Sequence, residues 1–195
     1  MHVNERVVEV PFALDQLESM KGRILDVGCA DSAFPLLLAA RGHDVVGLDV
    51  RPWSIPHPRF RFVLGDVRAL PFRDGTFGAV SMVSSVEHVG LGVYGDPEDR
   101  WGDVAACREA KRVLAPNGKL VLTVPFGHRA ISDLQRVYDP ASLDELLAGF
   151  SVDERRFFVH DDLQWLPADE ATAGQRESVP GTRAVALVVA RPSPR

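Results

Sequence analysis

The chain has few cysteines and no long apolar run. Only two of its 195 residues are cysteine, so it lacks both a disulfide framework and the paired cysteines of zinc motifs. No stretch is long and apolar enough to span a bilayer, and residues 1–9 lack the apolar core of a signal peptide. These absences predict a protein without a membrane span that works in the reducing cytoplasm.

An excess of basic residues is also missing. Lysine and arginine number 22 against 27 aspartates and glutamates, which gives a formal net charge of −5. Because proteins that bind a nucleic acid backbone usually carry a basic stripe, we do not expect a nucleic acid partner. The hydrophobic content of 46% suits a single globular domain over residues 1–195.

Apolar stretches of strand length alternate with stretches of helical spacing. We expect strands at 23–28, 44–49, 60–65, 79–84, 119–124, 150–159 and 184–190, and helices at 12–20, 32–41, 96–114 and 140–148. Asp31 or Ser32 is the expected N-cap of the second helix, and residues 169–181 are expected to form a loop. The alternation predicts a three-layer α/β fold around a mostly parallel sheet, with the last two strands paired as an antiparallel hairpin.

Glycine is scarce where a nucleotide-binding loop would need it. The segment "ILDVGCADS" (residues 24–32) ends a predicted buried strand and contains only Gly28. It matches neither the G-x-G-x-x-G pattern of dinucleotide loops nor the Gly-Lys-Ser/Thr of Walker loops. Asp26 would repel a diphosphate but attract an ammonium group. S-adenosylmethionine carries both an ammonium and a carboxylate, which suits Asp26 and the free N–H groups of the next helix. An aspartate that only caps its own turn fits equally well.

Two more acidic residues end the next two predicted strands. Asp49 follows Asp26 by 49 − 26 = 23 positions, where an acid at the end of the adjacent strand can accept hydrogen bonds from ribose hydroxyls. Asp66 ends the third strand and can accept from an adenine amino group, while Val50 can line one adenine face. Each aspartate alone can be a loop cap, but three at consecutive strand ends favour a nucleoside site.

The order of these motifs resembles the class I S-adenosylmethionine-dependent methyltransferases. The matching segments are "ILDVGCADS", "VVGLD", "GDV", "LPFRDGTFGAVSMVSSVEH" and "EAKRVLAPNGKLVLTVP", within about residues 21–126. The resemblance implies a Rossmann-like three-layer sandwich whose seven-stranded, mostly parallel sheet has an antiparallel last strand. It also implies S-adenosyl-L-methionine as cofactor, a cofactor-binding half at about 21–126 and an acceptor side at about 127–191.

The residues predicted to contact the cofactor lie around the ends of the first four strands. They are Asp26, Gly28, Cys29, Ala30, Asp49, Val50, Gly65, Asp66, Val67, Ser84 and Ser85. The family usually has further glycines where Ala30 and Ser32 stand, which leaves open a non-catalytic module with a degenerate cofactor loop. The segment "SSVEHVGLGVYGDP" (residues 84–97) is similar to a subgroup of small methyltransferase-like domains that are often associated with glycan or glycolipid assembly.

The segment after the fourth strand carries the predicted chemistry. Methyl transfer to a hydroxyl needs placement of the acceptor and is helped by a base that removes its proton. His88 is the predicted base, and Glu87 orients it or acts as the base itself, although both can instead stabilise a helical turn. The predicted acceptor contacts are Tyr94, His128, Arg129 and Tyr138.

The sequence thus predicts a methyltransferase acting on a small-molecule or glycan acceptor, at oxygen. His88, Asp96 and His128 lack a tight metal-ligand spacing, so no metal site is predicted. A non-catalytic binding module stays open as an alternative. A nucleotide-binding oxidoreductase is disfavoured by the missing glycines. The oligomeric state is also open, a homodimer included.

Overall fold

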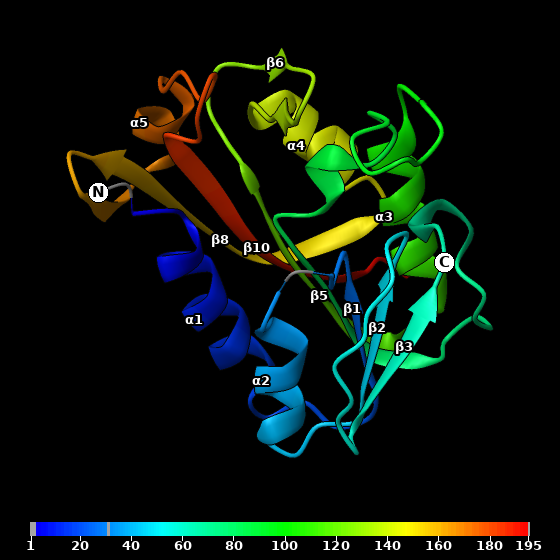
Figure 1. Cartoon of the computed structure of the whole chain (residues 1–195). Helices are drawn as coiled ribbons and strands as arrows, with labels where there is room; N and C mark the ends of the chain where they lie inside the picture. Colours follow the sequence, from blue (N-terminus) through cyan, green and yellow to red (C-terminus); the bar gives the residue numbers. More distant parts are fainter. Residues whose placement is uncertain (1–2, 31, 195) are drawn as a thin grey trace.

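The computed structural model describes residues 3–30 and 32–194, which form a three-layer α/β sandwich (Figure 1). Its central sheet has the strand order β3-β2-β1-β4-β5-β10-β8-β9. Strands β1 (Ile24–Val27), β2 (Val45–Asp49), β3 (Phe60–Leu64), β4 (Phe77–Val83) and β5 (Leu114–Pro125) run parallel to one another. The predicted Rossmann-like arrangement is therefore confirmed for the parallel part of the sheet.

The other edge of the sheet is antiparallel. Strand β10 (Ala184–Pro192) lies between β5 and β8 (Phe150–Asp161) and runs antiparallel to both. A strand that was not predicted, β9 (Gln164–Ala168), pairs with β8 and makes the sheet eight-stranded instead of seven-stranded. This strand is short and contains Pro167, so its residues carry little strand signal.

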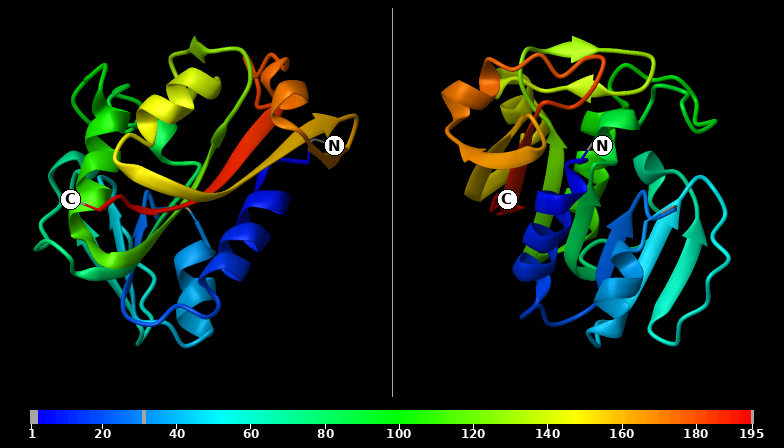
Figure 2. Two further views of the ribbon diagram at one scale, coloured as in Figure 1. Left: turned by 180° about the vertical axis from the view of Figure 1, so that it is seen from behind. Right: turned by 60° about the vertical axis from the view of Figure 1, so that its left-hand side comes forward.

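Helices cover both faces of the sheet, as Figure 1 and Figure 2 show. On one face α1 (Arg6–Leu17) and α2 (Phe34–Ala40) pack on the sheet, and on the other face lie α3 (Gly102–Val113), α4 (Pro140–Leu146) and α5 (Glu170–Gly174). Strand β10 follows this division, since its alanines face α3 and α4 while Val185, Leu187 and Val189 join the core under α1 and α2. Successive side chains of a strand point to opposite faces of the sheet, and β10 is buried on both faces, so its residues alternate between the two cores.

Three predicted elements differ from the structure. The helix expected at 96–114 begins only at Gly102, because the Asp96 carboxylate accepts from the Gly90 N–H (2.6 Å) and Arg68 donates to the Pro97 carbonyl (2.7 Å), which holds this stretch as a loop. The first helix starts at Arg6, earlier than expected, and α5 lies inside the expected loop 169–181. Asp31, one of the two expected caps, lies outside the described residues, while the Ser32 hydroxyl accepts from the Phe34 N–H at 3.2 Å.

The carboxyl ends of the parallel strands meet at one edge of the sheet. Two 3₁₀ turns, η1 (Val67–Ala69) and η2 (Val86–His88), and a small ribbon of β6 (Ala130–Ile131) and β7 (Arg136–Val137) follow strands β3, β4 and β5. In an open α/β sheet this edge is where ligands bind. Within the described part of the chain, no helix has the length and apolar character needed to cross a membrane.

Candidate functional site

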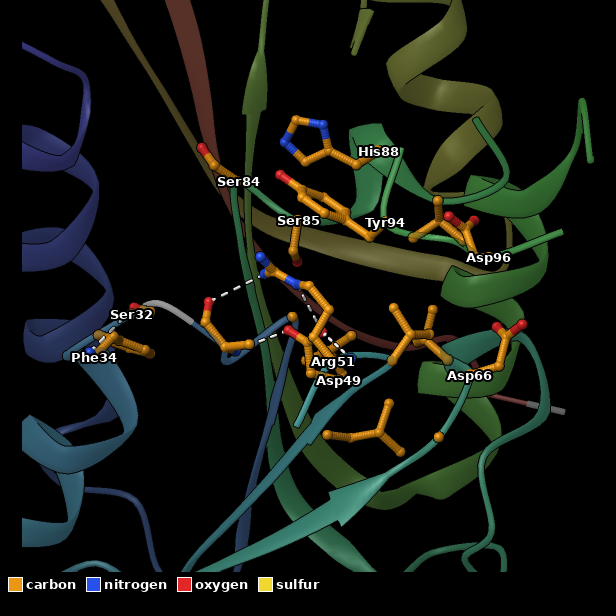
Figure 3. Close-up of a pocket in the computed structure, with 18 of the residues that line it drawn as sticks. Ser32, Phe34, Asp49, Arg51, Asp66, Ser84, Ser85, His88, Tyr94 and Asp96 are labelled. Atoms are coloured by element: carbon orange, nitrogen blue, oxygen red, sulfur yellow. Dashed lines mark hydrogen bonds and ion pairs between the residues drawn. The ribbon is translucent and has the colours of Figure 1, made fainter. Parts of the chain in front are cut away.

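A cavity of about 450 Å³ opens at the carboxyl edge of the sheet (Figure 3). It is bounded by the ends of β1 to β4, by α1 and α2, and by the loop after η2. The predicted residues that line it are Gly28, Ala30, Asp49, Val50, Gly65, Asp66, Val67, Ser84, Ser85, His88 and Tyr94. Most of the predicted cofactor residues therefore lie around one cavity, of a size that is usual for small-molecule sites.

Gly28 lets the first loop approach the end of β4. Its φ angle is +74°, which favours glycine, and a Cβ atom at this position would lie 2.5 Å from the Cβ of Ser85. Ser85 lines the cavity, but its hydroxyl oxygen is buried and has no hydrogen-bond partner among the residues that the structure describes. Gly28 and Ser85 thus form a narrow cradle at the end of β4.

The Asp49 carboxylate is buried at the end of β2 and is already engaged. One oxygen accepts from the Ala30 N–H at 2.8 Å, and the other accepts from the Arg51 N–H at 2.9 Å and from the Arg51 Nε at 3.4 Å. Asp49 thereby connects the loop after β1, which contains Ala30, with the loop after β2, which contains Arg51. Arg51, which the sequence analysis did not single out, lines the cavity beside it.

Asp66 has a similar local arrangement with a tighter ion pair. Its carboxylate accepts from the Arg68 N–H at 2.8 Å and from the Arg68 guanidinium at 2.6 Å, and this neighbour lowers the pKa of Asp66. The sequence signal for both pairs is a repeated Asp-Val-Arg, at 49–51 and 66–68. In each case the aspartate accepts the N–H two residues later, as in an Asx turn.

Asp26 and Cys29, which the sequence predicts as cofactor contacts, are not among the residues that line the cavity. The Asp26 carboxylate is 3% exposed and accepts from the Ser81 hydroxyl at 2.7 Å inside the sheet, and burial raises its pKa to about 7. Cys29 belongs to the apolar core under α1 and α2. The hydrogen bond with Ser81 of β4 holds the Asp26 carboxylate inside the sheet, and the Cys29 side chain packs among apolar side chains of α1 and α2.

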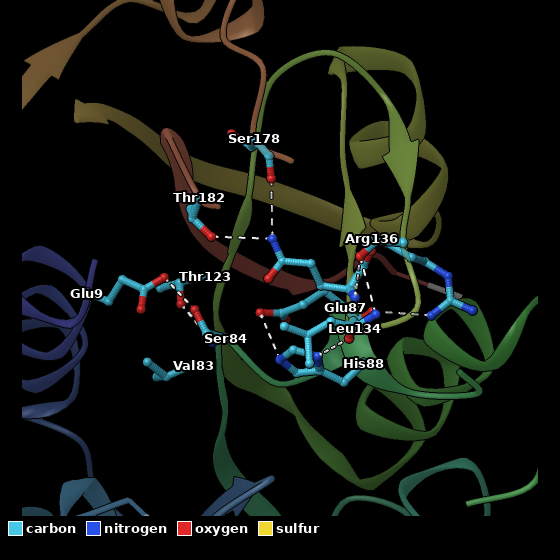
Figure 4. Close-up of polar contacts among 12 residues, drawn as sticks. Glu9, Val83, Ser84, Glu87, His88, Thr123, Leu134, Arg136, Ser178 and Thr182 are labelled. Carbon is cyan, nitrogen blue, oxygen red and sulfur yellow. Dashed lines mark hydrogen bonds and ion pairs between the residues drawn. The ribbon is translucent and has the colours of Figure 1, made fainter. Parts of the chain in front are cut away.

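Helix α1 supplies a cation and a buried acid to the end of β4. Arg6 lines the cavity and donates to the carbonyl of Val83 at 2.6 Å and to that of Ser84 at 3.4 Å. Glu9 accepts from the Ser84 hydroxyl at 2.6 Å, which supports the positive φ of Ser84 (Figure 4). Burial raises the pKa of Glu9 to about 7. The sequence analysis missed both residues, since nothing local connects α1 with β4.

His88 and Glu87 are neighbours with different surroundings. His88 lines the cavity, and its Nδ1 lies 2.6 Å from the Leu134 carbonyl, so Nδ1 is the protonated nitrogen and the lone pair is on Nε2. Glu87 is buried behind it, with Oε1 3.7 Å from that Nε2 and with Oε2 unpaired within the described chain (Figure 4). Burial lowers the pKa of His88 and raises that of Glu87 to about 8. Both groups are therefore largely neutral at pH 7.

Of the four predicted acceptor contacts, only Tyr94 lines this cavity. Tyr138 is buried and donates its hydroxyl proton to Asp103 at 2.9 Å, while His128 and Arg129 are exposed beyond β5. Arg136 lies between these residues in the sequence, on strand β7. Its buried guanidinium donates to the carbonyls of Val89 (2.6 Å) and Asp99 (3.2 Å) and so connects the β6–β7 ribbon with the loop after η2. Val89 itself lines the cavity.

The cavity does not bring the three residues His88, Asp96 and His128 together as metal ligands. Over residues 3–30 and 32–194, no group of three or more His, Cys, Asp and Glu side chains is arranged to hold a metal ion. His88 and Asp96 line the cavity, but His128 does not.

The buried Glu87 predicts how stability depends on pH. Between about pH 4.5 and 8 the folded state keeps a proton on Glu87 that the unfolded state has lost, so raising the pH lowers the free energy of unfolding. Asp26 and Glu9 act in the same direction up to about pH 7. We expect the melting temperature of the protein to fall between pH 7 and 9, and Glu87→Gln to reduce that fall. An equal fall in both proteins would contradict the buried, protonated Glu87.

Comparisons with known proteins find methyltransferases. The family model described as a methyltransferase domain matches residues 25–122. A demethylmenaquinone methyltransferase of Thermus thermophilus is 37% identical over 54% of this chain and 48% of its own length. A ribosomal RNA large subunit methyltransferase of Brachyspira hyodysenteriae is 29% identical over 58% of this chain and 61% of its own length. The chain thus spans about half to three fifths of the length of these relatives.

The fold is also that of solved methyltransferase structures. A Burkholderia thailandensis 1,6-didemethyltoxoflavin-N1-methyltransferase, solved with bound 1,6-didemethyltoxoflavin and S-adenosylhomocysteine, superposes with a TM-score of 0.66 at 16% identity, covering 98% of this chain and 80% of that one. At this identity the likeness concerns the fold. With the family model matching half of the sequence and the cavity lying at the expected strand ends, the chain belongs to the family of class I S-adenosylmethionine-dependent methyltransferases.

Proposed function

We propose that this chain transfers a methyl group from S-adenosyl-L-methionine to a hydroxylated small-molecule acceptor. The observation that carries the proposal is the single cavity wall formed by Gly28, Asp49, Asp66, Ser85 and His88 at the carboxyl edge of the sheet. The cofactor, when bound, supplies a methyl group activated by a sulfonium. Catalysis by the protein then consists of placement and proton removal.

The two ends of the cavity suit the two ends of this cofactor. Asp49 can accept from ribose hydroxyls, and Val50, Asp66 and Val67 surround the place of the adenine. At the other end Ser85 lines the cavity, and Arg6 brings a cation that suits a carboxylate. Asp26 supports the cavity wall indirectly, because its hydrogen bond with Ser81 connects the neighbouring strands β1 and β4.

His88 is proposed as the general base. The Leu134 carbonyl holds the proton on Nδ1, which leaves the Nε2 lone pair to receive the proton of an acceptor hydroxyl. The lowered pKa keeps the imidazole neutral at pH 7. Glu87 is proposed as a positioning residue behind the ring.

The acceptor class is the least constrained part of the proposal. Removing the proton of a hydroxyl on an aromatic ring activates either that oxygen or the adjacent ring carbon. O-methylation is our first candidate, for a small molecule or a glycan. The names of the quinone-modifying relatives favour methylation of a ring carbon as the second candidate. Mass fragmentation of the product distinguishes the two.

A non-catalytic module is the alternative, and Ala30 motivates it. The methyl group of Ala30 does not fill the cavity, which keeps about 450 Å³ beside it. Isothermal titration with S-adenosylhomocysteine tests this directly. We expect binding in the micromolar range, and absence of binding at millimolar concentration would refute the proposed function.

The role of His88 is tested by His88→Asn. With an acceptor found by screening a library with labelled cofactor, we expect turnover to fall by roughly 100-fold, the usual size of a general-base contribution. The affinity for S-adenosylhomocysteine should stay the same, and the rise of rate with pH on the acid side should disappear. A variant with full activity would make His88 a structural residue.

A further inference from the structure

The two aspartates that face the nucleoside end of the cavity are each paired with an arginine two residues later. The Asp49–Arg51 and Asp66–Arg68 pairs differ in the length of their contacts and in the exposure of the arginine. Arg68 contacts both carboxylate oxygens of Asp66, the shortest at 2.6 Å, and its side chain is only 12% exposed. It also donates to the Pro97 carbonyl, so it is a fixed part of the wall.

Arg51 lines the cavity, and its side-chain contact with Asp49 is longer than the contact of Arg68 with Asp66. Its Nε is 3.4 Å from the Asp49 carboxylate, its Nη2 is 3.4 Å from the Ala30 carbonyl, and its side chain is 32% exposed. Its guanidinium carbon is 4.2 Å from the centre of the Tyr94 ring, a cation–π contact. Figure 3 shows the Arg51 side chain between Asp49 and Tyr94.

Tyr94 also contacts His88, the residue proposed as the general base. Its ring meets the His88 ring edge to face, with centres 5.5 Å apart. Asp49, Arg51, Tyr94 and His88 therefore form a continuous row from the end of β2 to η2, which crosses the cavity. The guanidinium occupies the space that faces the Asp49 carboxylate, where ribose hydroxyls would have to bind.

We propose that Arg51 is an internal competitor for the ribose-binding carboxylate of Asp49, and that Tyr94 holds it in that position. Nucleoside binding would replace the Arg51 guanidinium at Asp49 by the ribose hydroxyls and release Arg51 from the row. Arg51 thereby sets the cofactor affinity, and its displacement frees the Tyr94 ring next to His88. The inference rests on the proposed function, because it assumes that the nucleoside binds at Asp49.

The experiment compares Arg51→Gln with Arg68→Gln in titrations with S-adenosylhomocysteine. Glutamine keeps a polar side chain but removes the charge and the planar fork. Losing a weak ion pair and an exposed cation–π contact from the free state should tighten binding of Arg51→Gln by about tenfold. Arg68→Gln, which loosens the fixed wall, should bind no tighter than the unmodified protein.

Two further variants separate competition from a general change in the loop. In the Asp49→Asn background, the gain from Arg51→Gln should disappear, because the carboxylate that attracts Arg51 is gone. Tyr94→Leu removes the aromatic face that contacts Arg51 and should tighten binding in the same direction as Arg51→Gln. Far-ultraviolet circular dichroism before each titration checks that the variants are folded.

The outcomes are distinguishable. If the unmodified protein and all variants fail to bind S-adenosylhomocysteine, the proposed function fails. If the unmodified protein binds while Arg51→Gln binds equally or more weakly, the competitor role is wrong, and weaker binding would make Arg51 a direct cofactor ligand. Equal tightening by Arg51→Gln with and without the Asp49 carboxylate would also overturn the inference.

Discussion

Replacing Gly28 with alanine is expected to weaken the binding of S-adenosylhomocysteine by roughly 100-fold, or about 2.7 kcal/mol. Two effects add at this position. The backbone has a φ angle of +74°, which costs any residue with a Cβ, and the new methyl group would lie 2.5 Å from the Cβ of Ser85. The loop and the end of β4 must therefore move apart, which opens the cradle where we propose that the amino-acid end of the cofactor binds.

Gly42→Ala is the matched control for this variant. Gly42 also has a positive φ angle, +95°, but a Cβ there would have no atom within 4 Å. It should lose on the order of 1 kcal/mol of stability from backbone strain alone. It should bind S-adenosylhomocysteine like the unmodified protein, because it lies after α2 and away from the cavity. An equal affinity loss in both variants would show that strain, not the cradle, matters.

Asp49→Ala is expected to weaken S-adenosylhomocysteine binding by about 10- to 150-fold, from the loss of hydrogen bonds to a charged group worth about 1.5–3 kcal/mol. The variant also leaves the Ala30 N–H without its acceptor, which loosens the first loop. Isothermal titration measures the change, and Asp49→Asn, which keeps one oxygen, should give an intermediate loss.

Asp66→Ala serves as the comparison at the adenine side. The Arg68 guanidinium contacts both Asp66 oxygens, the shortest at 2.6 Å, whereas the Arg51 guanidinium contacts one Asp49 oxygen at 3.4 Å, so a ligand competes with a closer ion pair at Asp66. We expect its loss of affinity to be smaller than that of Asp49→Ala. The reverse order would mean that the nucleoside depends mainly on Asp66 and would remove the ribose assignment of Asp49.

The parallel core was predictable because its signals are local. At 23–28, 44–49 and 60–65 an apolar stretch ends in an acidic residue or a glycine. The apolar residues indicate a buried strand, and the acidic residue or glycine indicates where that strand ends. Since parallel strands end at one edge, the sequence also predicted that Gly28, Asp49 and Asp66 come together. It did not predict β9 or the late start of α3, since these depend on pairing with β8 and on bonds made by Asp96 and Arg68.

The electrostatics of the site were predicted less well. From the sequence we expected the carboxylates of Asp26, Asp49 and Asp66 to face a cationic nucleoside ligand at the strand ends. In the structure Asp49 and Asp66 are each paired with an arginine, and Asp26 is buried with a pKa of about 7. The charges of Asp49 and Asp66 are therefore compensated within the protein, and Asp26 is screened from the cavity by its burial.

The sequence by itself determined the family, the parallel sheet and the chain positions at which the site residues occur, because each follows from patterns a few residues long. Only the tertiary structure decided which of those side chains face the cavity and what they contact. Arg6 reaches the end of β4 across 77 positions, and Leu134 fixes the His88 tautomer across 46. Such contacts depend on how packed elements orient their side chains, and no local pattern encodes that orientation.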